Sequence, residues 1–103
     1  MNRVIVRLTA VLLALVPVGC GGPPQIGADK ETFKAVDALY TAVGLRDARL
    51  VDQCQEKLKT LRGAGKMPED ASRSLESIIV EAKGGKWEPA QERLSKFMEG
   101  QRR

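Results

Sequence analysis

The sequence predicts an all-α fold built from two antiparallel αα-hairpins, and two observations support this prediction. Between residues 29 and 103, apolar side chains recur every three to four positions in four separate segments, whereas no segment alternates with the period of two that strands require. Short glycine-containing breaks separate the first segment from the second and the third from the fourth. Such connections force neighbouring helices to run antiparallel. We therefore expect four short helices.

The first hairpin is expected to consist of helices over residues 30–43 and 47–62. Asp29 is suited to be the N-cap of the first helix, and Gly44 to end it. The second helix is expected to end at Gly63-Ala64-Gly65. The apolar stripes are Phe33, Val36, Leu39, Tyr40 and Val43 in the first helix, and Leu50, Val51, Cys54, Leu58 and Leu61 in the second.

The second hairpin begins at Pro68, because proline is favoured in the first turn of a helix. Glu69 and Asp70 follow it, where carboxylates interact favourably with the positive end of the helix dipole. This helix is expected to end at Gly84-Gly85, and the last helix to span residues 87–99. The stripes are Ala71, Leu75, Ile78, Ile79 and Ala82, and then Ala90, Leu94, Phe97 and Met98.

The turn of the second hairpin, Gly85-Lys86-Trp87-Glu88-Pro89-Ala90 followed by Leu94, is similar to the mid-repeat turn of tetratricopeptide repeats (TPR). The resemblance covers residues 75–98. It implies TPR-like packing, with a groove for a peptide or helix, as the alternative to a small bundle. Trp87 is the candidate partner contact, because tryptophan is enriched at binding hot spots. The alternative is that Trp87 only packs at the mouth of the hairpin.

Residues 1–19 have the order of an export signal. Arg3 and Arg7 form a charged start, and an apolar run of about 11 residues follows. This run is too short for a transmembrane helix, because a bilayer core needs about 20 apolar residues. An ordinary cleaved signal needs small residues one and three positions before the cut. Neither Ala14 nor Gly19 satisfies both positions, so a secreted chain without lipid is the less favoured alternative.

The end of this segment, Val18-Gly19-Cys20, resembles the lipobox of bacterial lipoproteins, with Pro17 where that family usually has leucine. The resemblance implies cleavage after Gly19, acyl chains on Cys20, and a chain that faces the periplasm from a membrane of the cell envelope. Aspartate after the cysteine retains such proteins at the inner membrane. Because Gly21 stands there, the resemblance favours the outer membrane.

The mature chain is expected to have two parts. Residues 20–28 hold the lipidated cysteine and a Gly/Pro-rich segment that reads as a flexible tether of about 25–30 Å. Residues 29–103 form the small helical domain. Roughly 20 apolar side chains make a marginal core for a domain of this size. Part of the stripes is therefore expected to be buried against a protein partner or a second copy.

Most catalytic chemistry is excluded by composition. The chain has no histidine, which removes the common catalytic triads and imidazole metal ligands. No glycine-rich phosphate loop is present. Glu88 and Glu92 lie at i and i+4 and are read as a solvated charged face. We expect no enzyme activity, no metal and no cofactor. Interspersed charges and only four aromatic residues also argue against nucleic-acid binding.

Cys54 would be the only free cysteine if Cys20 carries lipid. Its place on an apolar stripe favours burial as a small hydrophobic residue. An intermolecular disulfide is the alternative, and a bridge to Cys20 is possible if no lipid is added.

The function expected from these features is that of a lipid-anchored envelope protein whose helical domain is a non-catalytic protein-interaction module. Two other classes remain open. One is a small inhibitor or immunity-type lipoprotein, and the other is an envelope-structural lipoprotein.

Overall fold

The structure, a computed structural model, describes residues 23–101, and this part of the chain contains four α-helices and no strand. They are α2 (Lys30–Gly44), α3 (Ala48–Gly63), α4 (Glu69–Lys83) and α5 (Trp87–Glu99). The prediction of an all-α fold with two αα-hairpins is confirmed. The expected signal peptide and the lipidated Cys20 lie outside the described residues.

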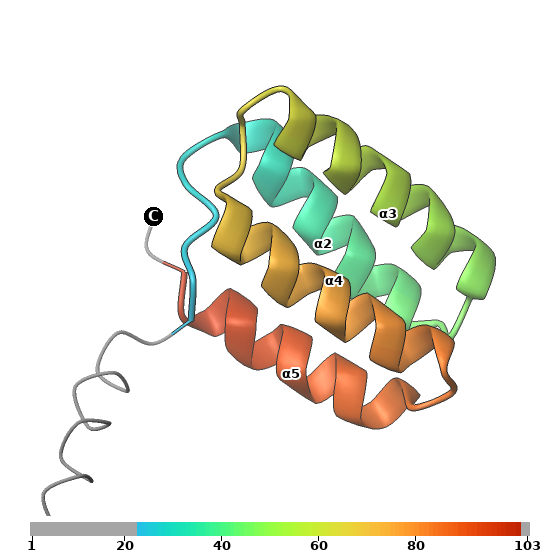
Figure 1. Ribbon diagram of the computed structural model, residues 1–103. Coiled ribbons are helices and arrows are strands. Elements are labelled where there is room, and N and C mark those ends of the chain that lie inside the picture. The colour runs from blue at the N-terminus through green and yellow to red at the C-terminus, as the bar shows by residue number, and fades with distance from the viewer. Residues whose placement is uncertain (1–22, 102–103) are drawn as a thin grey trace, which may run out of the picture.

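The four helices form a closed bundle (Figure 1). Within each hairpin, α2 packs against α3 and α4 packs against α5. Between the hairpins, α3 packs against α4 and α2 packs against α5. Each helix thus contacts two neighbours, and the last helix returns to the first. The sequence allowed either TPR-like packing or a small bundle, and these contacts are those of a small bundle.

Aspartates begin both helices of the first hairpin. Oδ2 of Asp29 accepts a hydrogen bond from the backbone N–H of Thr32 at 3.0 Å. Oδ1 of Asp47 accepts hydrogen bonds from the N–H groups of Arg49 and Leu50 at 3.0 and 3.2 Å. Asp47 therefore lies just before α3 and not inside it. Each cap satisfies backbone donors that have no partner within the helix.

The core is formed by the predicted stripes, with additions from the connections. Buried stripe residues are Val36, Leu39, Val43, Val51, Leu58, Leu61, Ala71, Leu75, Ile78, Ile79, Ala82, Ala90, Leu94 and Phe97. Phe33, Tyr40, Leu50, Cys54, Trp87 and Met98 are partly buried and pack against this core. Ile26 and Met67, which belong to no helix, are also buried. The core therefore extends beyond the helices into the segment before α2 and the loop before α4.

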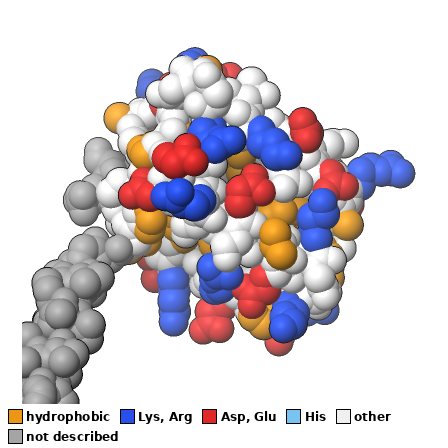
Figure 2. Space-filling model, viewed as in Figure 1, with side chains coloured by type: hydrophobic (Ala, Val, Ile, Leu, Met, Phe, Trp, Pro, Cys, Tyr) orange, Lys and Arg blue, Asp and Glu red, His pale blue; other side chains and the backbone are white. Residues whose placement is uncertain are grey.

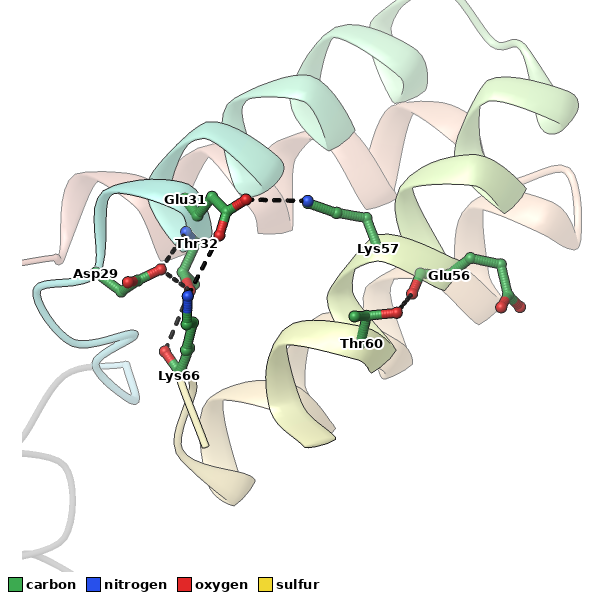
Figure 3. Close-up of polar contacts among 7 residues, drawn as sticks. All are labelled: Asp29, Glu31, Thr32, Glu56, Lys57, Thr60 and Lys66. Atoms are coloured by element: carbon green, nitrogen blue, oxygen red, sulfur yellow. Dashed lines mark hydrogen bonds and ion pairs between the residues drawn. The ribbon is translucent and has the colours of Figure 1, made fainter. Parts of the chain in front are cut away.

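Thr32 links the start of α2 to the loop between α3 and α4 (Figure 3). Its side chain is fully buried, and its Oγ1 lies 3.1 Å from the carbonyl oxygen of Lys66 and 3.1 Å from Oδ2 of Asp29. The half-exposed Glu31 lies beside this contact and pairs with Lys57 and Lys66 at 3.2 and 3.5 Å. The hydrogen bond from Lys57 is the main reason that the pKa of Glu31 is lowered.

Thr32→Val is expected to lower the free energy of unfolding by about 1–3 kcal/mol, because it leaves the Lys66 carbonyl without its buried donor. Thr60→Val is the matched control. The Thr60 hydroxyl is exposed and donates only to the carbonyl of Glu56 in its own helix, so the expected loss is within about 0.5 kcal/mol. Urea denaturation of both variants measures the difference. Equal losses would show that the buried hydroxyl has no special role.

Candidate functional site

The segment before α2 is part of the bundle, which differs from the expected flexible tether. Ile26 is only 1% exposed, and its side chain lies in the core. Its backbone N–H donates to Oε1 of Gln101 at 2.8 Å. Nε2 of Gln101 donates in turn to the carbonyls of Pro24 and Phe97 at 2.8 and 2.9 Å. One side chain therefore joins the segment before α2 to the end of α5.

Two further contacts hold the same segment. Nε2 of Gln25 donates to the carbonyl of Gly100 at 2.9 Å. A Cβ on Gly100 would overlap the ring of Pro23, so the absence of a side chain at Gly100 permits this close approach. The expectation of a free tether therefore needs correction for residues 23–28, because they gain both apolar burial and hydrogen bonds from α5. Residues 20–22 lie outside the described range.

The segment before α2 and the end of α5 lie at one end of the bundle, and the two hairpin turns lie at the opposite end (Figure 1). We name the end formed by residues 23–29, 63–68 and 100–101 the anchor end, because the chain enters from residue 22 there. The hydrogen bonds from Gln25 to Gly100 and from Thr32 to Lys66 hold its parts together. The opposite end contains the two hairpin turns, residues 44–47 and 84–87, and we name it the turn end.

Trp87 lies at the turn end, where it is the first residue of α5. It is half-buried and packs against the core, so the packing contact expected at the mouth of the hairpin is present. Two large hydrophobic side chains are exposed among the described residues, namely Leu45 at 64% and Val80 at 68%. Leu45 belongs to the first hairpin turn, and Val80 to the last turn of α4. Apolar side chains thus reach the surface at or near the turn end.

A groove runs along one side of the bundle, between α2 and α5. Its volume is about 520 Å³, and its lining is formed by Tyr40, Glu88, Pro89, Gln91, Glu92, Ser95, Lys96 and Glu99. Both Glu88 and Glu92, predicted to share one face of α5, lie here and are exposed. The cation of the groove, Lys96, pairs with Glu92 at 3.9 Å, and both side chains are more than 70% exposed. The lining therefore carries three carboxylates and one ammonium group.

The surface elsewhere carries mixed charge. On the face seen in Figure 2, Lys and Arg side chains alternate with Asp and Glu side chains, and small hydrophobic patches lie between them. Ion pairs also connect neighbouring helices, such as Arg93 of α5 with Glu81 of α4 at 2.8 Å and Arg62 of α3 with Glu69 of α4 at 3.1 Å. All these pairs are at least partly exposed and contribute little to stability. No basic stripe is visible on this face.

Cys54 is half-buried on α3 and packs against the core. It takes part in no disulfide within the described residues. Burial raises the pKa of its thiol, so the thiolate is less populated at neutral pH than for an exposed cysteine. The Cys54 side chain is thus partly and not fully buried, and the raised pKa makes its thiol a weaker nucleophile at neutral pH.

Residues 23–101 contain no group of three or more His, Cys, Asp or Glu side chains that could hold a metal ion. In the same range, no helix is long and apolar enough to cross a membrane.

Comparisons with protein-family models, curated proteins and solved structures find no match to this chain. The proposal for its function therefore rests on its own residues.

Proposed function

We propose that the protein is a lipid-anchored component of the bacterial cell envelope, and that its helical bundle is a non-catalytic module that binds a partner protein. The observation that carries this proposal is the export signal that ends in Val18-Gly19-Cys20. Acyl chains on Cys20 would hold the bundle on the periplasmic side of the membrane. With Gly21 after the cysteine, the outer membrane is favoured.

The turn end supports the second half of the proposal. Leu45 is well exposed in the first turn, while Trp87 begins the helix after the second turn and is half-buried. A partly buried tryptophan is held rigidly by its own core and still offers apolar surface to a partner, as hot-spot residues do. We therefore place the partner contact at the turn end, with Trp87 and Leu45 as its candidate residues.

Photo-crosslinking in living cells tests this contact. A photoreactive amino acid in place of Leu45 is expected to give one discrete adduct, and Trp87→Ala in the same chain is expected to reduce that adduct several-fold. The matched control places the photoreactive group at Lys59, which is exposed on α3 toward the anchor end. Circular dichroism must show that Trp87→Ala keeps its helices.

An adduct at Leu45 that persists in the Trp87→Ala chain, or equal adducts from Leu45 and Lys59, would contradict the proposed contact. An adduct with twice the mass of the chain would identify the partner as a second copy.

A further inference from the structure

We propose that the anchor end of the bundle faces an anionic lipid bilayer and that α5 points its C-terminus toward the bilayer, so that the turn end is the part of the domain farthest from the membrane. The inference rests on the proposed lipidation of Cys20. The inference specifies how the bundle is oriented relative to the bilayer. Lipidation alone would not fix this orientation, because a domain on a flexible tether can rotate freely.

Few residues connect Cys20 to the part of the chain that is packed on the bundle. Because residues 23–28 are packed on the bundle, only three residue steps separate Cys20 from Pro23. A fully extended chain spans at most about 3.6 Å per residue, so Pro23 lies within about 11 Å of Cys20. The 13 residues of α5 are about 20 Å long at 1.5 Å per residue. The largest possible distance from Cys20 to Pro23 is therefore shorter than α5.

The second argument is that the attachment point is fixed. Gln101 bonds to both Ile26 and Pro24, and Ile26 is buried in the core. The ring of Pro23 contacts Gly100 at the end of α5. Lipidation of Cys20 would therefore restrain the position of the C-terminal end of α5 directly, because Pro23 is packed against that end. This end must stay near the membrane as long as the fold is intact.

The third argument is charge, which distinguishes an upright bundle from one that lies on its side. Along α5, the groove beside α2 carries the exposed carboxylates of Glu88 and Glu92, which lie in the first two turns of the helix. Anionic headgroups repel such a face. These carboxylates therefore disfavour a bundle that lies with this side of α5 on an anionic bilayer.

The chain provides its own probe, because Trp87 is its only tryptophan. The lipidated protein is reconstituted into phosphatidylglycerol-containing vesicles with a spin label on some of the headgroups, which quenches tryptophan only at short range. The matched variant, Trp87→Phe/Glu99→Trp, moves the probe to the exposed last residue of the same helix, about 18 Å along the axis. Quenching is expected to be several-fold stronger at position 99 than at position 87. Acrylamide quenching in lipid-free samples corrects for the different exposure of the two sites.

Equal quenching at both positions would mean that α5 lies flat on the bilayer, and it would overturn the inference. Stronger quenching at position 87, or none at either position, would also overturn it. To separate this result from the lipidation itself, the fragment 20–103 with Cys54→Ser is coupled through Cys20 to a maleimide lipid in the same vesicles. If the native protein carries no acyl chain, the proposed function fails, while the coupled fragment still reports the orientation that attachment at Cys20 imposes.

Discussion

Ile26→Ala is expected to lower the free energy of unfolding by about 2–5 kcal/mol, the usual cost of truncating a buried isoleucine. The effect is large for a residue that precedes the first helix, because small domains have only about 5–15 kcal/mol of stability in total. The loss arises because Ile26 is 1% exposed and packs with residues from the helices. Urea denaturation of lipid-free residues 20–103, with Cys54→Ser in all chains, measures it.

Leu45→Ala is the matched control for this prediction. It also truncates an aliphatic side chain outside the helices, but Leu45 is 64% exposed, so the expected change is within about 0.5 kcal/mol. If Ile26→Ala were equally neutral, residues 23–28 would be a free tether. The inferred orientation at the membrane would then lose its main support.

Cys20→Ala is expected to abolish lipid attachment completely, since the substitution removes the sulfur at which we propose that the acyl chains are attached. Cells fed labelled palmitate should incorporate the label into the wild-type chain and into Cys54→Ala, but not into Cys20→Ala. Cys54 is the proper control because it is the other cysteine of the chain and lies on α3. Label in the Cys20→Ala protein would contradict the assignment of the acyl site.

The helices could be predicted from the sequence because their signals are local. The apolar stripes repeat within single turns, Asp29 caps a helix three residues later, and the glycines mark the turns. These features depend on neighbours within a few positions along the chain. The contact between α2 and α5 that closes the bundle depends on tertiary packing. The apolar stripes alone did not distinguish a closed bundle from TPR-like packing of the two hairpins.

The packing of the segment before α2 could not be predicted in the same way. Ile26 is the only large apolar residue between Gly21 and Asp29, so it shows no periodicity. Its partner Gln101 lies 75 positions away, and nothing local marks a glutamine as the acceptor for a distant backbone N–H. The one available signal was a single large aliphatic residue within an otherwise tether-like segment. Such a residue is costly to leave in water.

The candidate site was partly predictable. The helical spacing placed Glu88 and Glu92 on one exposed face of α5, and the structure puts both there. The position of Trp87 at a hairpin turn likewise followed from the flanking glycines. The exposed Leu45 was not singled out, because it belongs to a turn and to no stripe. Its exposure follows from the three-dimensional path of that turn, in which Arg46 adopts a left-handed conformation with φ of 54°.

The intact mass of the native protein tests the central claim most directly. We expect a chain that begins at Cys20, with a mass that exceeds that of residues 20–103 by the mass of its acyl chains. In the Cys20→Ala protein this excess should be absent. A native mass equal to that of unmodified residues 20–103, or to that of the full chain from Met1, would contradict the lipid anchor and the function built on it.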